Sequence, residues 1–346
     1  MKFENKISIV NFILAVMVVL LHSQNILIYE DVMGNAVHGS EYLISNTIGN
    51  LAVPSFFMIS SYLFFRNYGK DKILSKYKSR VRSVLIPYLV WNVMYYAAFV
   101  VLKRLPVIGS LMTTQEVPVS FTELVSSVIF YKYNGVYWFM YQLILFIIIS
   151  PIVYFLIGSK AGIIVPIILY VINFKVTRVP ALSQGLHLDM LLFWCIGCYF
   201  AVHKAEVFEK VEAGKTAVIC FAASVILIGV RFRLEFNEIM FPYRSFVLYS
   251  MLLVNVVVFW FGLNVFKYEK TGSWMKITFF IYSMHPLLVD FIKKGLAVVL
   301  PHTEIIAAVN YVLAAGVSLV IVFGVAKILK KFCPALWGIL NGGRKV

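Results

Sequence analysis

The sequence predicts an all-α fold: a polytopic bundle of about ten membrane-spanning helices with both termini in the cytoplasm. Of the 346 residues, 61% are hydrophobic and only 14% are charged, and the mean hydropathy is +0.87. An ordinary soluble domain is about 45–50% apolar and about 25% charged. The composition therefore excludes a soluble enzyme, a disordered chain and a fibrous protein. No stretch is polar enough for a separate soluble domain, so we expect a single transmembrane domain over residues 1–346.

Ten apolar segments approach the roughly 20 residues that a helix needs to cross a bilayer. They are 7–28, 43–64, 83–102, 137–157, 162–176, 187–203, 217–231, 243–263, 277–294 and 304–326. Segment 120–131 is too short to span, and we expect a surface helix or a re-entrant element there. The first span follows Lys2 and Lys6 but ends in polar residues without a cleavage site. We therefore interpret it as a retained helix rather than a signal peptide.

Basic residues set the predicted orientation. With the N-terminus in the cytoplasm, the inner segments hold 21 of the 31 lysines and arginines, and seven of these lie in the 66–82 loop. Inner loops of membrane proteins are enriched in Lys and Arg, and an even number of spans returns the chain to its starting side. Membrane topology and contact with anionic lipid headgroups thus explain the net charge of +15, and nucleic acid is not an expected partner.

The four cysteines lie in or beside apolar segments: Cys195, Cys198, Cys220 and Cys333. Cys195 and Cys198 have a C-x-x-C spacing, but neither further metal ligands nor a redox-fold context accompanies them. We interpret them as small packing residues of a membrane helix. We expect no metal site and no bound cofactor.

Polar groups inside spans are costly, which makes them candidates for function. One face of the first span carries a polar or small residue every three or four positions: Ser8, Asn11, Ala15, Val18, His22 and Asn25. Asn11 and His22 are about 16 Å apart along this face. His22 is either a catalytic group or a structural histidine bonded to a neighbouring helix, and the two interpretations weigh equally.

The ninth span supplies a second histidine, His285, on one helix face with Thr278 and Tyr282. Pro286 lacks an N–H and disturbs the helix just after this histidine. A free backbone carbonyl near a titratable side chain suits a lined cavity. The alternative is an ordinary proline kink that the histidine fills.

Two acids and an aromatic cluster have simpler explanations. Asp189 begins the sixth span and is expected to mark the interface, whereas Asp290 is expected to pair with Lys293 or Lys294. Aromatic side chains crowd the predicted outer side: Tyr131, Tyr133, Tyr137 and Trp138, with Asn134 among them. They could stack against a sugar, although an interfacial aromatic belt is the more usual explanation.

Several of these motifs together resemble the membrane-bound acyltransferase 3 family, whose members O-acylate the sugars of polysaccharides, lipopolysaccharide, cell wall and other glycans. The first span ends in VVLLHS around His22, and residues 53–63 read VPSFFMISSYL, close to the family's VPxFFxISGYL. Lys78-Ser79-Arg80 leads to LIPY at 85–88, YWF at 137–139 opens the fourth span, and Tyr282-x-x-His285-Pro286 matches a late YxxHP element. Their order makes the resemblance cover nearly the whole chain.

The chain departs from the family at two positions. Relatives carry an arginine eleven residues before the first-span histidine, and this arginine is thought to help hold the acyl donor. Here the position is Asn11, which can hydrogen-bond but brings no charge. Either Arg80, Arg82 or a lysine of the 66–82 loop replaces it, or the donor site is weakened. Ser61 stands where the family has glycine.

The resemblance implies a multi-pass acyltransferase of the cell membrane, most simply an O-acetyltransferase. Its donor would be cytoplasmic acetyl-CoA, or another acyl-CoA, as a co-substrate, and its acceptor a hydroxyl of a glycan or lipid-linked sugar. A hydroxyl needs a base to attack a thioester, and histidine, with an ordinary pKa of about 6.5, suits this task. We assign His22 as the base, and we assign His285 to acceptor binding, orientation of His22 or oxyanion stabilisation.

The remaining candidate residues take binding roles under this interpretation. Arg80, Arg82 and Asn11 are expected to bind the donor, and Tyr282 and Trp138 the substrate. Two alternatives stay open: a non-enzymatic transporter or flippase of a lipid-linked sugar, and a degenerate family member with a scaffolding role. The transporter predicts substrate movement without consumption of an acyl donor, and the missing arginine at position 11 keeps both alternatives open.

Overall fold

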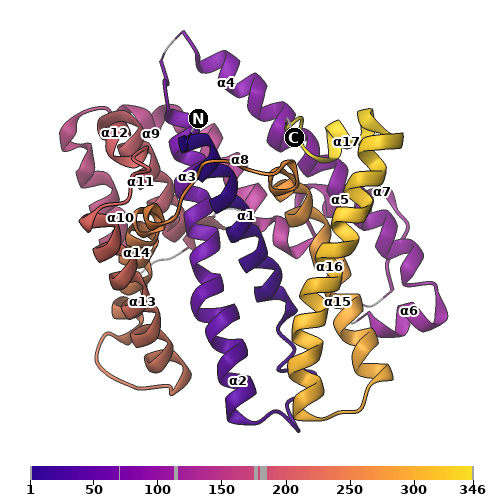
Figure 1. Ribbon diagram of the computed structural model, residues 1–346. Helices are drawn as coiled ribbons and strands as arrows, with labels where there is room; N and C mark the ends of the chain where they lie inside the picture. Colours follow the sequence, from indigo (N-terminus) through magenta and orange to yellow (C-terminus); the bar gives the residue numbers. More distant parts are fainter. Residues whose placement is uncertain (1, 70, 113–115, 175–177, 180–184, 345–346) are drawn as a thin grey trace. The chain divides into compact units, whose positions relative to one another are not determined.

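The computed structural model describes residues 2–69, 71–112, 116–174, 178–179 and 185–344, and helices make up most of them (Figure 1). The chain packs as two compact units that alternate along the sequence. The first unit comprises Met1–Leu21, Gly39–Ile73 and Leu145–Met275, and the second comprises His22–His38, Leu74–Ile144 and Lys276–Val346. The prediction of a single domain stays a prediction.

The first unit is built mainly on eight helices: α1 (Lys2–Ser23), α3 (Ala52–Phe65), α9 (Ser150–Ile157), α10 (Ile164–Asn173), α11 (Leu188–His203), α12 (Ala205–Phe208), α13 (Lys215–Phe236) and α14 (Arg244–Gly262). Short π or 3₁₀ segments extend them at Leu43–Ile48, Gly49–Leu51, Lys160–Ile163 and Leu263–Val265. Two short strands, β1 (Arg178–Val179) and β2 (Leu186–His187), pair antiparallel. The end of α2 (Asn35–Tyr42) also belongs to this unit.

The second unit contains α4 (Ile73–Arg80), α5 (Ile86–Leu102), α6 (Pro106–Leu111), α7 (Phe121–Ile129), α8 (Trp138–Ile148), α15 (Thr278–Val299), α16 (Glu304–Phe332) and α17 (Pro334–Leu340). A π segment at Val81–Leu85 joins α4 to α5, and 3₁₀ turns at Gly135–Tyr137 and Ser273–Ile277 precede α8 and α15. Three ends of these elements fall in the first unit: residue Ile73 of α4, residues 145–148 of α8, and residues 273–275 of the 3₁₀ turn before α15. The second unit also includes the end of α1, from His22.

Each of the ten predicted spans contains a helix among its described residues. Among the described residues, seven helical stretches are long and apolar enough to cross a membrane: Lys2–Ser23, Asn35–Phe65, Ile73–Leu102, Lys215–Phe236, Arg244–Val265, Ser273–Val299 and Glu304–Phe332. A bent pair, Gly135–Ile148 and Ser150–Ile157, makes up to eight, with an angle of 61° at the break. Two further predicted spans correspond to shorter apolar helices, Lys160–Asn173 and Leu188–His203. The all-α membrane bundle is therefore confirmed, and the number of about ten crossings stays a prediction.

The first helix is shifted toward the N-terminus, since it occupies Lys2–Ser23 rather than 7–28. At its start, the fully buried Lys6 donates from Nζ to the Trp260 carbonyl (2.9 Å) and to Asn264 Oδ1 (2.7 Å). These acceptors let a charged residue sit within the helix. Because the helix ends at Ser23, Asn25 lies in the following turn and not on the polar face that the sequence predicted.

A close helix crossing in the first unit joins α3 and α11. A Cβ at Gly197 would lie 2.2 Å from the Met58 carbonyl oxygen and 2.8 Å from Ser61 Cβ, so only glycine fits there. Ser61, which stands where the family has glycine, is fully buried and donates from Oγ to the Trp194 carbonyl. Its hydroxyl therefore adds an interhelical hydrogen bond at the crossing. Cys195 and Cys198 are free and buried on the same helix.

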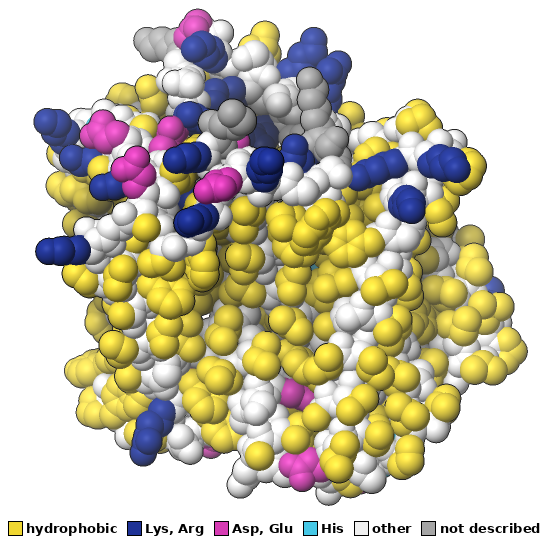
Figure 2. All heavy atoms as spheres, viewed as in Figure 1, with side chains coloured by type: hydrophobic (Ala, Val, Ile, Leu, Met, Phe, Trp, Pro, Cys, Tyr) yellow, Lys and Arg dark blue, Asp and Glu magenta, His cyan; other side chains and the backbone are white. Residues whose placement is uncertain are grey.

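Within each unit, segments predicted to be cytoplasmic lie together. In the first unit Arg66 and Glu209, from the 66–82 and 203–216 loops, form an ion pair of 2.7 Å, and the Asn5 side chain donates to the Glu269 carbonyl at 2.8 Å. In the second unit the Trp91 indole N–H donates to the Leu340 carbonyl, which joins α5 to the C-terminal tail. On the face shown in Figure 2, hydrophobic side chains cover the middle of the helices, and Lys and Arg gather toward helix ends.

Candidate active site

The two histidines that the sequence singled out lie side by side in the second unit. His22 is on the last turn of α1 and His285 is in the N-terminal half of α15, and their ring centroids are 5.3 Å apart. His285 is fully buried, whereas His22 is partly exposed. The fold thus brings together two imidazoles that are 263 positions apart in the chain.

The hydrogen bonding of His285 defines which of its nitrogens is free. Nδ1 lies 3.1 Å from the Ile281 carbonyl oxygen. A carbonyl only accepts hydrogen bonds, so Nδ1 carries the proton and Nε2 holds a lone pair. This Nε2 is buried and has no hydrogen-bond partner among the described residues. Pro286 lies inside α15 without ending it, and His285 is therefore held as a buried acceptor on a continuous helix.

His22 is held in place through its backbone. Lys293 of α15 donates from Nζ to the His22 carbonyl (3.1 Å) and to the Gln24 carbonyl (3.2 Å). The last carbonyls of a helix lack intrahelical partners, and a cation there also interacts favourably with the helix dipole. Lys293 therefore caps α1 directly beside His22. The helix ends here, rather than at residue 28 as the sequence predicted, because these carbonyls are satisfied from outside the helix.

Asparagines of neighbouring segments reinforce this end of α1. The buried Asn310 of α16 donates to the Lys293 carbonyl and to the Tyr29 hydroxyl, both at 2.9 Å. The Asn25 amide donates to the Ala307 carbonyl, also at 2.9 Å. The turn after His22 is thus tied to α15 and α16, which limits how far the His22 backbone can move.

Tyrosines form a buried layer next to His285. The Tyr137 hydroxyl donates to Ser283 Oγ (2.7 Å), and the Tyr95 hydroxyl donates to the Ser283 carbonyl (2.9 Å). The Tyr282 ring lies 6.4 Å from the His285 ring and packs edge-on against Tyr137 at 5.7 Å. The Tyr282 hydroxyl donates to the Val136 carbonyl. That hydroxyl would therefore have to leave Val136 before it could donate to a substrate.

The other predicted site residues divide between the two units. Asn11 belongs to the first unit, and its Oδ1 is buried with no partner among the described residues. Arg80, Arg82 and Trp138 belong to the second unit with the histidines. Arg82 is exposed on the π segment, whereas Arg80, at the end of α4, and Trp138, at the start of α8, are partly buried.

The outlying acids and aromatics largely serve as structural groups. Asp290 pairs with Lys294 at 2.8 Å, one of the two partners predicted for it. Asp189 lies in the first turn of α11, and its Oδ1 is 3.6 Å from Nδ1 of His187.

Glu123 has two hydrogen-bond donors. Lys132 Nζ lies 2.6 Å from its Oε1, and the Tyr133 hydroxyl donates to the same oxygen. These partners hold the pKa of the Glu123 carboxyl below its usual range. Glu123 lies in the first turn of α7, a short helix within the segment 120–131, and its backbone N–H donates to Ser120 Oγ at the helix start.

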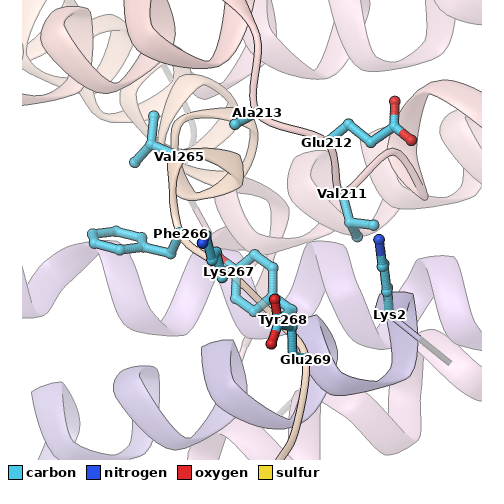
Figure 3. A pocket seen from close by; sticks show the side chains of 9 residues that line it. All are labelled: Lys2, Val211, Glu212, Ala213, Val265, Phe266, Lys267, Tyr268 and Glu269. Carbon is cyan, nitrogen blue, oxygen red and sulfur yellow. The ribbon is translucent and has the colours of Figure 1, made fainter.

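A pocket of about 460 Å³ lies in the first unit (Figure 3). Lys2 and Glu212 border one side of it, and Lys267, Tyr268 and Glu269 border the other. The N-terminus and two loops that the sequence assigned to the cytoplasmic side meet here. Two lysines stand beside two glutamates, so the pocket offers no excess of positive charge to an anionic ligand. Within the described residues, His, Cys, Asp and Glu form no group of three that could hold a metal.

Sequence reasoning missed several residues of this region. It considered Lys293 only as a partner of Asp290, and it did not single out Tyr95, Ser283, Asn310 or Arg344. For Asn310 the available signal was a polar residue inside an otherwise apolar run. The others carry no local signal, because their roles depend on which helices pack together.

The two neighbouring histidines belong to helical stretches that are long and apolar enough to cross a membrane. The comparison with protein families identifies the class: residues 5–327 match the family described as an acyltransferase domain, Acyl_transf_3. The match covers most of the chain, and the protein therefore belongs to the acyltransferase 3 family and is a multi-pass membrane acyltransferase. No curated protein and no solved structure matches the chain.

Proposed function

We propose that this protein is an O-acetyltransferase of the cell membrane that uses cytoplasmic acetyl-CoA to acetylate a hydroxyl of a glycan or lipid-linked sugar. One observation carries the proposal. In a chain of the acyltransferase family, two imidazoles on helices long and apolar enough to cross a membrane lie with ring centroids 5.3 Å apart. Ionisable groups at such positions are costly and are usually functional.

The two histidines take different roles because their exposure differs. His22 is partly exposed and can reach a substrate, so it acts as the general base. His285 is buried behind a fixed Nδ1–H and keeps an acceptor lone pair on Nε2. A small rotation of the His22 ring would let its N–H donate to that lone pair. The buried group would then orient the base, as in nucleophile–base–orienter arrangements.

In the proposed reaction, His22 carries the proton from the acceptor hydroxyl to the leaving thiolate. His22 takes the proton of the acceptor hydroxyl as its oxygen attacks the thioester carbonyl carbon of acetyl-CoA. The new C–O bond forms, the carbon–sulfur bond breaks, and the CoA thiolate receives the proton from His22. The products are the O-acetylated sugar and CoA. Arg80 supplies positive charge for the donor phosphates, and Trp138 supplies a ring face for the sugar.

The test uses the purified protein in nanodiscs with radiolabelled acetyl-CoA and a glycan extract of the host. We expect CoA release and label in the glycan from the wild type. His22→Ala should lower turnover by roughly 10²–10⁴-fold, the usual contribution of a general base. His285→Gln should lower kcat while leaving the KM for acetyl-CoA near its wild-type value. His302→Ala is the matched control, because His302 is an exposed histidine of the same unit.

Full activity in His22→Ala would contradict its assignment as the base. A folded wild-type protein that consumes no acyl donor, whichever donor and acceptor are offered, would contradict the acyltransferase. Movement of a lipid-linked sugar without donor consumption would then favour the transporter, the alternative that Asn11 in place of the family arginine keeps open.

A further inference from the structure

The C-terminal segment after α16 folds back onto the second unit. Its short helix α17 lies beside α5 (Figure 1). Trp337 of α17 packs its ring against Phe280 of α15, with centroids 5.1 Å apart, and the Leu340 carbonyl accepts the Trp91 indole N–H at 3.0 Å. The segment is thus anchored to both α5 and α15. It lies beyond the residues 5–327 that the family pattern covers.

Two glycines after α17 turn the chain inward. Gly342 and Gly343 have φ angles of +66° and +65°, a left-handed conformation that favours glycine. A Cβ at Gly342 would lie 2.9 Å from the Ser83 carbonyl oxygen and 2.2 Å from a guanidinium nitrogen of Arg344. A side chain at this position would therefore displace the tail from Ser83 and disturb Arg344.

This turn places Arg344 among the helices of the second unit. Its guanidinium carbon lies 4.2 Å from the centre of the Phe279 ring, and Nη1 donates to the Asn341 carbonyl at 3.0 Å. Arg80 and the Tyr137 hydroxyl are within electrostatic range of it. Burial and the positive charge of Arg80 lower the pKa of Arg344 to about 10, so the guanidinium remains charged at neutral pH.

In the described part of the chain, no carboxylate lies within ion-pair distance of Arg344. A mostly buried charge is costly unless it is paired, and a second arginine nearby adds repulsion. The aromatic face of Phe279 offsets only part of this cost. An anion that accepts hydrogen bonds from the Arg344 guanidinium would balance this charge, and phosphate suits its planar donors.

The position of Arg344 relates this charge to the histidines. Phe279, beneath the guanidinium, is six residues before His285 on α15, or about 9 Å along the helix axis. The buried Tyr137 connects the two regions, since it is close to Arg344 and donates to Ser283. CoA carries its phosphates at one end of a flexible arm and the thioester at the other. Phosphates at Arg344 would let the arm extend along α15 toward His285.

We propose that Arg344, together with Arg80, binds the phosphate groups of the acyl-CoA donor and takes the place of the arginine that relatives carry where this chain has Asn11. The inference rests on the proposed function, because it names the donor site of that same reaction. Arg82, exposed on the neighbouring π segment, is not part of this pair.

The first experiment measures CoA binding to the full chain in phosphatidylcholine nanodiscs by titration calorimetry. Arg344→Gln should raise the Kd for CoA by roughly 10- to 100-fold, as expected for the loss of charge-assisted hydrogen bonds to phosphate. Arg344→Lys should restore part of the affinity, because it keeps the charge but loses the planar donors. Lys331→Gln removes an exposed positive charge from the end of α16 and should leave the Kd unchanged.

A second experiment needs no variant. Phenylglyoxal modifies arginine side chains, and peptide mass spectrometry reports the rate at each position in the wild-type protein. CoA should slow the modification of Arg344 and leave the exposed Arg82 unaffected. If phosphatidylglycerol in the nanodisc protects Arg344 and CoA does not, the phosphate ligand is a lipid headgroup and the donor assignment is overturned. Absence of protection by either phosphate source also overturns it.

The two proposals can fail separately. A wild type that binds CoA through Arg344 but transfers no acetyl group contradicts the proposed function and leaves the phosphate site standing. A wild type that transfers acetyl groups, with an unchanged KM for acetyl-CoA in folded Arg344→Gln, contradicts the phosphate site and leaves the proposed function standing.

Discussion

At the scale of single residues, the candidate active site depends on polar groups whose cost in a membrane is met by specific partners. Lys293 is the clearest case, because its ammonium group replaces intrahelical donors at the end of α1 by donating to the carbonyls of His22 and Gln24. The neighbouring Lys294 only pairs with Asp290, whose side chain is 44% exposed. Two adjacent lysines of one helix thus differ in what they stabilise.

Lys293→Met should destabilise the protein and impair catalysis together. The substitution leaves the carbonyls of His22 and Gln24 without a donor, and we expect the free energy of unfolding to fall by about 1–3 kcal/mol. Turnover should fall because the His22 backbone is no longer held. Denaturant titration and the acetyl-transfer assay measure the two effects. Lys294→Met is the control and should change stability by less than about 1 kcal/mol, as for an exposed ion pair; equal effects of the two variants would refute the capping role.

At the scale of elements, close approach of helices is decided by small residues. The crossing of α3 and α11 requires Gly197, where a Cβ would lie 2.2 Å from the Met58 carbonyl oxygen. Within a membrane the hydrophobic effect does not drive helices together, so close van der Waals contacts of this kind stabilise their association. An interhelical hydrogen bond such as that from Ser61 to the Trp194 carbonyl adds to them. By contrast, Gly229 in α13 has open space at its Cβ position.

Gly197→Ala should separate α3 from α11 and lower the free energy of unfolding by about 1–3 kcal/mol, the usual cost of overpacking. Gly229→Ala makes the same chemical change where nothing is in the way. It should leave stability unchanged or raise it by up to about 1 kcal/mol, because alanine has the higher helix propensity. Denaturant titration of both variants in the same detergent compares them, and a Gly197→Ala variant as stable as wild type would contradict the close crossing.

At the scale of the whole molecule, the distribution of basic residues predicts which ends of the helices face the cytoplasm. The first unit agrees with this in one respect: the N-terminus, the 203–216 loop and the 264–276 loop all line one pocket. Segments that meet at one pocket lie on the same side of a membrane. The opposite ends of α13 and α14 are joined by the turn that contains Asn237.

Accessibility labelling tests this orientation. In a background with Cys220 and Cys333 changed to serine, Lys267→Cys should react with a membrane-impermeant maleimide only in inverted vesicles. Asn237→Cys should react in intact cells, because its exposed turn is predicted to be outside. Cys195 and Cys198 remain as buried, unreactive controls. The reverse pattern of labelling would contradict the predicted topology, and with it the supply of CoA to this side of the protein.

The sequence by itself determined the class of fold, the family and the approximate positions of the long apolar helices. These properties are local: hydrophobic runs, the spacing of polar residues and short motifs such as Tyr282-x-x-His285-Pro286 persist whatever the helices pack against. It also singled out His22 and His285, because an ionisable residue in an apolar run is conspicuous. It placed the end of the first helix five residues too late, since that end depends on Lys293.

Only the tertiary structure decided which of these residues meet. His22 and His285 become neighbours because the end of α1 packs against α15, and a separation of 263 positions carries no local sign of that contact. The same holds for Arg344, whose position depends on two left-handed glycines and on where α17 docks. Helical periodicity shows which face a residue occupies, whereas the partner of that face follows from the packing of the whole unit.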